Sequence, residues 1–96
     1  MKHVFWVCIK SKTLTSCKTV SERLMKLFLA DGINSAGVTV DDAGCEFTAE
    51  TRMGNVEGSY KYLGFKKQYT FFKFELTSVP LFVDPEIVER WIRSAL

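Results

Sequence analysis

The stretch Lys66–Thr77, KKQYTFFKFELT, decides the fold, because it is the longest run whose side chains alternate in character with the two-residue period of a β-strand. Successive side chains of a strand point to opposite faces, so the stretch has one apolar face and one mixed face. The apolar face is predicted to belong to the core, and it carries Thr70, Phe72, Phe74 and Leu76. The mixed face carries Tyr69, Phe71, Lys73 and Glu75.

The segment His3–Ile9 is predicted to form the first strand, because it is rich in β-branched and aromatic residues. Apolar residues occupy both of its faces, which is typical of a central strand. A helix follows that begins at Ser16 or Thr19, either of which can cap it, and that ends at Gly32. The order strand, helix, strand then predicts a right-handed crossover, after which Ala36–Val40 runs parallel to the first strand.

Three turns are predicted to fold the middle of the chain into antiparallel hairpins. Acidic residues and a glycine mark the turn Asp41–Gly44, which leads into a strand at Cys45–Thr51. Met53–Asn55 turns the chain into a strand at Val56–Leu63, and Gly64–Lys67 turns it into the opening stretch.

A second helix is predicted after Pro80, because proline cannot donate to the strand ladder and ends the opening stretch. Asp84 is a favoured cap, Pro85 has the φ angle of the first helical position, and Glu86 suits the positive end of the helix dipole. The apolar side of this helix is predicted to carry Ile87, Val88, Trp91, Ile92 and Ala95.

These elements predict one α+β domain spanning residues 1–96. Its architecture is a single-layer, mainly antiparallel sheet of about five strands with two helices, in the order β-α-β-β-β-β-α. Packing both helices on one face of the sheet is the economical way to bury their apolar sides.

The composition is that of an ordinary globular protein, with 47% hydrophobic residues and a net charge of +2. The charge is unevenly distributed: acids dominate residues 31–57, and residues 59–74 carry lysines and no acid. Three cysteines cannot all pair within the chain, which favours a reducing, cytoplasmic location. The N-terminal apolar run Val4–Ile9 is too short to cross a bilayer, so no membrane partner is expected.

No set of residues predicts catalysis, a cofactor or a metal site. One histidine and unpaired cysteines do not supply the converging ligands that zinc needs. Cys17, near a helix N-terminus, is the only thiol placed to have a lowered pKa, but His3 lies at the far end of the first strand. We therefore expect a non-enzymatic protein with no cofactor.

The mixed face of the opening stretch is the strongest functional signal. An apolar sheet surface that exceeds the needs of the core commonly marks a protein interface. The leading hypothesis is therefore a protein-interaction module, a homodimer that uses this sheet face or an edge strand. The interaction face is predicted to comprise Leu63, Phe65, Tyr69, Phe71 and Lys73.

Two alternatives remain open. Aromatic side chains interleaved with lysines on a sheet are also a platform for single-stranded nucleic acid, because bases stack on the rings and phosphates pair with the amines. The lysines of this site would be Lys61, Lys66, Lys67 and Lys73. The other alternative is a small-ligand pocket between helices and sheet, lined by Tyr60, Tyr62 and Trp91.

Overall fold

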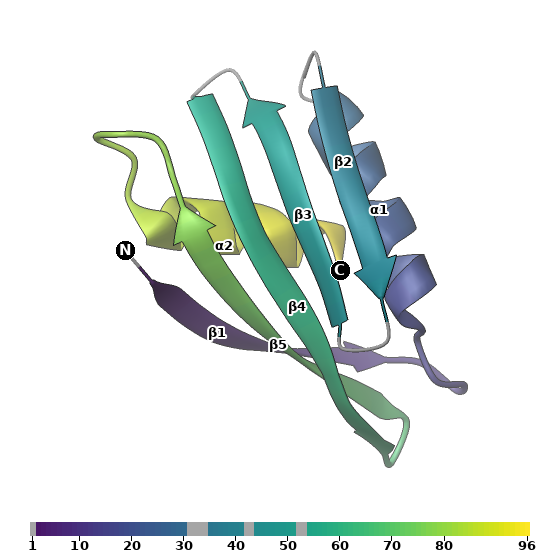
Figure 1. The fold of residues 1–96 in the computed structure, drawn as a ribbon. Helices are drawn as coiled ribbons and strands as arrows, with labels where there is room; N and C mark the ends of the chain where they lie inside the picture. The colour runs from purple at the N-terminus through teal and green to yellow at the C-terminus, as the bar shows by residue number, and fades with distance from the viewer. Residues whose placement is uncertain (1, 31–34, 42–43, 52–53) are drawn as a thin grey trace.

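The computed structural model describes residues 2–30, 35–41, 44–51 and 54–96. Along the chain the elements are β1 (His3–Lys10), α1 (Cys17–Ala30), β2 (Ser35–Asp41), β3 (Gly44–Thr51), β4 (Gly54–Lys66), β5 (Tyr69–Ser78) and α2 (Pro85–Ala95) (Figure 1). They form one sheet in the order β1-β5-β4-β3-β2, with every neighbouring pair antiparallel. The predicted α+β class, with a single antiparallel sheet and two helices, is confirmed.

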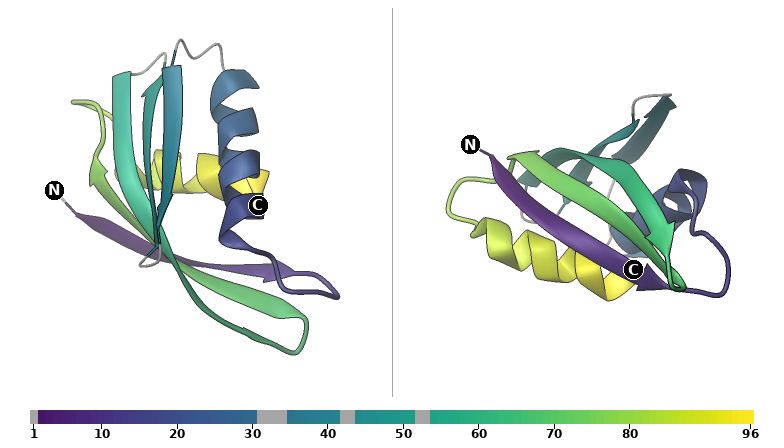
Figure 2. Two further views of the ribbon diagram at one scale, coloured as in Figure 1. Left: turned by 45° about the vertical axis from the view of Figure 1, so that its right-hand side comes forward. Right: turned by 90° about the horizontal axis from the view of Figure 1, so that it is seen from below.

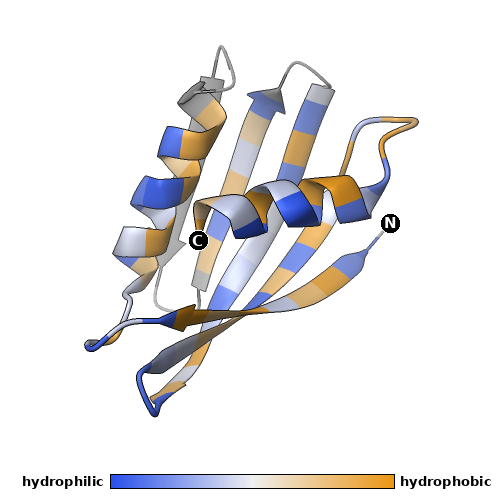
Figure 3. Ribbon diagram, turned by 180° about the vertical axis from the view of Figure 1, so that it is seen from behind, coloured by the Kyte–Doolittle hydropathy of each residue, from blue (hydrophilic) through white to orange (hydrophobic). Residues whose placement is uncertain are grey.

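Both helices pack on the same side of the sheet, as the two views of Figure 2 show. The apolar face of β5 is fully buried there, as predicted, with Phe72, Phe74 and Leu76 at 0% exposure. In the view from the helix side, α2 runs across the strands and α1 lies beside it (Figure 3). From the helices the core receives Val20, Leu24, Phe28, Val88 and Ile92.

The position of β1 differs from the prediction of a central strand. It pairs with β5 and forms one edge of the sheet. Only one of its faces is buried, by Phe5, Val7 and Ile9, while Trp6 and Cys8 are exposed. The apolar residues on the second face misled the prediction, because they are surface residues with no helix above them.

The strand after α1 is not a neighbour of β1, as a simple crossover would make it. The alternating pairings give β2 the same direction as β1, but three strands separate the two. β2 pairs with β3 and forms the opposite edge. The connection that contains α1 therefore joins the two edges of the sheet, and α1 itself packs beside β2 and β3 (Figure 1).

The helix and turn predictions have mixed outcomes. Ser16 is the residue that caps α1, since its hydroxyl accepts from the amide of Thr19 at 3.1 Å. Asp84 caps α2 as predicted, accepting from the amide of Glu86 at 2.9 Å. The predicted helix end at Gly32, and the central residues of the turns before β3 and β4, lie outside the described residues.

The β4–β5 hairpin extends further than predicted. β4 continues to Lys66, and the turn is made by Lys67 and Gln68, which both have positive φ, at 52° and 68°. Two positive φ values match the twist of a two-residue hairpin turn. Gly64 is not in the turn but follows an irregularity in the β4–β5 register between Tyr62 and Gly64.

Gly58 in β4 allows a close approach of its neighbours in the sheet. A Cβ atom at this position would lie 2.5 Å from the carbonyl oxygen of Glu75 and 2.8 Å from Cζ of Phe47. Glycine is therefore needed here to let the Phe47 ring, itself 1% exposed, cover β4.

Polar contacts fasten α2 to the edge strand β1. Arg93 donates from Nη2 to the carbonyl oxygen of Trp6 at 2.7 Å, and its guanidinium lies over the Phe5 ring at 5.3 Å from the centroid. Glu89 joins Arg93 Nε at 3.0 Å and His3 Nε2 at 2.7 Å. Burial acts to raise the pKa of Glu89, but the hydrogen bonds from His3 and Arg93 outweigh it and lower that pKa below its usual value.

Replacing Gly58 by alanine is expected to lower the free energy of unfolding by about 1–3 kcal/mol, because the new methyl group overpacks the contact with Phe47 and Glu75. Urea denaturation monitored by circular dichroism measures the change. Glu57→Ala, at an exposed neighbouring position, is the matched control and should shift the free energy by less than about 0.5 kcal/mol. Equal effects of the two substitutions would contradict the close approach.

Replacing Glu89 by glutamine is expected to lower stability at neutral pH and to matter less in acid. The folded pKa lies below the unfolded value of 4.5, so the stabilisation is present above that value and is lost as the pH falls through the folded pKa. The difference in unfolding free energy between wild type and Glu89→Gln should therefore shrink as the pH falls below the unfolded value of 4.5. Exposed Glu22→Gln on α1 is the control, and a pH-independent difference for Glu89→Gln would rule out this linkage.

Candidate functional site

The face of the sheet opposite the helices is open to solvent. Trp6 of β1 is 57% exposed, and Tyr69 and Phe71 of β5 are 38% and 36% exposed. The mixed face of the opening stretch is thus uncovered by either helix. These large aromatic side chains are exposed to solvent, whereas the other face of the sheet contributes the residues of the core.

Strand register brings lysines between these rings. One row of residues that lie directly opposite one another across β4, β5 and β1 consists of Lys61, Lys73 and Trp6. A second row, nearer the hairpin turn, consists of Lys66, Tyr69 and Lys10. Between these two rows, Phe71 lies opposite Gly64 and Cys8. We call the exposed residues of these three rows the aromatic–lysine face: Trp6, Cys8, Lys10, Lys61, Lys66, Tyr69, Phe71 and Lys73.

The aromatic–lysine face contains four lysines and no acid. Lys61 and Lys73 are direct cross-strand neighbours, an arrangement that destabilises a sheet when no anion is present. Within β1, β5 and β4, the first acid on this side is Glu75, one row further from the hairpin turn, and it is paired with Lys2 at 3.2 Å. The concentration of positive charge therefore has a sharp boundary.

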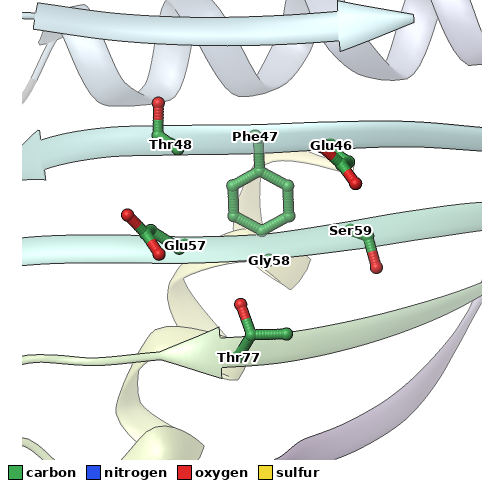
Figure 4. Close-up of a pocket in the computed structure, with 7 residues that line it drawn as sticks. All are labelled: Glu46, Phe47, Thr48, Glu57, Gly58, Ser59 and Thr77. Atoms are coloured by element: carbon green, nitrogen blue, oxygen red, sulfur yellow. The ribbon is translucent and has the colours of Figure 1, made fainter. Parts of the chain in front are cut away.

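Beyond that boundary the open side of the sheet becomes polar and acidic. A shallow hollow of about 210 Å³ lies over the pair formed by Phe47 and Gly58 (Figure 4). Exposed Glu46 and Glu57 stand at its sides. The remaining residues around it are Thr48, Ser59 and Thr77. One face of the sheet thus carries a basic aromatic end and an acidic end.

The other predicted members of the site lie around the hairpin turn. Lys67 is exposed in the turn itself. Leu63 is 50% exposed at the irregularity next to Gly64. Phe65 lies opposite Thr70, whose side is that of the helices, so Phe65 projects from the opposite face to Tyr69 and Phe71. Because of this irregular register, Phe65 lies on the face opposite to the one that simple alternation along the strand predicted.

The three residues predicted to line a pocket have different surroundings. Tyr60 is 2% exposed, and its ring stacks on Phe74 with centroids 5.1 Å apart. Tyr62 is 40% exposed and meets the edge of Phe72. Trp91 is half-buried on α2. Its ring packs against Phe28 of α1.

The polar tip of Tyr60 belongs to a small buried network. Its hydroxyl bonds the hydroxyl of Ser21, which donates to the carbonyl oxygen of Cys17 at 2.8 Å. Burial, together with Cys45, raises the pKa of the Tyr60 phenol. Burial and Cys45 likewise raise the pKa of the Cys17 thiol, the opposite of the lowering expected from a position near a helix N-terminus.

Trp6, Cys8 and Lys10 are the members of the face that sequence reasoning missed. Interpreting β1 as a central strand assigned Trp6 and Cys8 to the interior. The available signal was alternation in the last part of β1, where Lys10 shares a face with both residues. A lysine in that series predicts a solvated face.

A second exposed apolar feature lies in the loop between β5 and α2. Leu81 and Phe82 are 81% and 99% exposed, and Phe82 has a φ of 71°. The turn is closed by a hydrogen bond of 3.1 Å from the amide of Val83 to the carbonyl oxygen of Pro80. This tip is separate from the aromatic–lysine face.

Within the described residues, no three His, Cys, Asp or Glu side chains converge as metal ligands. None of the described helices has the length and hydropathy needed to span a membrane. No protein-family model and no curated protein matches the chain.

Proposed function

We propose that the protein binds single-stranded nucleic acid through the aromatic–lysine face. The observation that carries this proposal is the placement of three exposed aromatic rings and four lysines, without an acid, in three neighbouring rows of β1, β5 and β4 on one solvent-exposed sheet face. Base stacking on such rings contributes about 1–3 kcal/mol per base. Lysines add a salt-dependent attraction to phosphates.

The Lys61–Lys73 pair supports the proposal independently. Two like charges directly opposite each other cost folding free energy, and departures from local preference of this kind concentrate at functional sites. A phosphate bound between the two amines would reverse the sign of the interaction. The same pair gives no advantage to a surface that has no anionic partner.

A second copy of the chain is the competing occupant of this face. In a two-fold dimer residue i of one copy meets residue j of the other, so an axis through the basic end would bring the lysines together and would be repulsive. Only an axis between the two ends, which places the basic end of each copy over the acidic end of the other, would be electrostatically favourable. Pairing through the β1 edge is impeded, because Arg93 already donates to the outward carbonyl of Trp6.

Replacing Phe71 by alanine is expected to weaken binding of a labelled twelve-nucleotide oligothymidylate or oligouridylate by roughly 5- to 150-fold, the loss of one stacked base. Fluorescence anisotropy at about 50 mM salt measures the affinity. Phe65→Ala is the matched control, because Phe65 is equally exposed, at 38%, on the opposite face of the same hairpin. Equal losses from both substitutions would contradict the assignment of the face.

Replacing Lys73 by alanine is expected to reduce the salt dependence of the same binding reaction. For single strands the logarithmic slope falls by about 0.7 for each phosphate contact removed. Lys26→Ala, at an exposed position on α1, is the control and should leave the slope unchanged.

Sedimentation equilibrium separates nucleic-acid binding from self-association. Failure to bind either oligonucleotide at low salt would overturn the proposed function. A dimer that Phe71→Ala dissociates, in the same absence of oligonucleotide binding, would assign the face to a second copy.

A further inference from the structure

The three rings of the aromatic–lysine face are spaced too widely for a stacked strand. The centroids of Tyr69 and Phe71 are 6.5 Å apart. Trp6 lies diagonally from Phe71, since Phe71 faces Cys8 and Trp6 faces Lys73. Diagonal neighbours across an antiparallel pair are about 7–8 Å apart. The step between the Tyr69 and Phe71 rings is thus about twice the 3.4 Å separation of stacked bases, and the backbone positions of Phe71 and Trp6 are separated by a similar distance.

We infer that the site takes three unstacked bases of an extended single strand, one each on Tyr69, Phe71 and Trp6; this inference rests on the proposed function. A duplex cannot satisfy the spacing, because its bases stay stacked and their faces are covered. A single strand can, because its bases separate and each turns a free face to one ring.

The middle position is shaped to admit a base. Phe71 lies between Gly64 and Cys8 in its row, and a Cβ atom placed on Gly64 would have no atom within 4 Å. The small neighbours leave space beside the Phe71 ring. At the outer positions the rings stand next to lysines instead, Tyr69 beside Lys10 and Lys66.

Charge limits the length of strand that the face can hold. Lys61 and Lys73 stand in the row of Trp6, and the next row contains Glu75, whose carboxylate is already engaged by Lys2. Glu46 lies in the same row as Glu75, and Glu57 lies beyond it, so phosphates of a strand that continued in this direction would be repelled. At the other end the sheet stops at the hairpin turn. Three rows of sheet therefore correspond to three bases.

The test is a length series of oligothymidylates from one to eight nucleotides, competed against a labelled twelve-mer on the full chain at fixed low salt. We expect affinity to rise roughly 5-fold or more with each nucleotide up to three, and much less with each one added afterwards. A twelve-base-pair duplex should bind at least about tenfold more weakly than the single strand.

The position of the bound strand is tested by alkylation of Cys8, which is exposed in the row of Phe71. We expect a saturating trinucleotide to slow the reaction of Cys8 with N-ethylmaleimide at least fivefold. Cys8→Ser, which removes the reactive group, identifies the labelled residue. An unchanged rate at saturation would overturn the placement of the strand.

The outcomes distinguish a failure of the proposed function from a failure of the three-base site. No binding of any oligonucleotide at low salt overturns the proposed function and this inference together. Binding in which affinity keeps rising equally with each nucleotide from four to eight, or in which the duplex matches the single strand, leaves the proposed function standing and overturns the three-base site.

Discussion

The structure depends on β5 pairing along both of its edges, with β1 on one side and β4 on the other. Because its side chains alternate, seating Phe72, Phe74 and Leu76 beneath the helices forces Tyr69, Phe71 and Lys73 to the opposite side. The two partner strands then supply the neighbours of those residues. The open face is therefore a geometric by-product of building the core, and its chemistry is set by which residues the register aligns. A slip of β5 by one residue would bury Lys73 and expose the phenylalanines of the core.

Much of the fold could be predicted from local patterns. Period-two alternation identified the core face of β5, and Asp84, Pro85 and Glu86 identified the start of α2, because each rests on interactions between residues close in sequence. Strand neighbours could not be obtained in this way. Whether β1 is central or at an edge depends on where α1 returns the chain. The crossover rule gives the direction of β2 but not how many strands lie between it and β1.

The candidate site was predictable where it lies within one strand and obscure where it depends on pairing. Tyr69, Phe71 and Lys73 follow from alternation alone. Trp6 and Cys8 required knowing that β1 has one free face, and the opposite orientation of Phe65 required the irregular register after Tyr62. A shift in register of this kind is a local backbone event without a clear sequence signature here. The juxtaposition of Lys61 with Lys73, which unites two strands, is visible only in the sheet.

The separation of charge along the open face has a consequence for the speed of association. Lys10, Lys61, Lys66 and Lys73 lie at one end, whereas Glu46 and Glu57 lie at the other, so the surface has an electric dipole even though the chain's net charge is only +2. A polyanion arriving by diffusion is turned toward the basic end before any ring is touched. A larger fraction of the diffusional encounters then occurs in the orientation that allows binding. For the proposed complex with nucleic acid, ionic strength would accordingly act first on the association rate constant, while the lifetime of that complex would reflect how well the bases fit their rings.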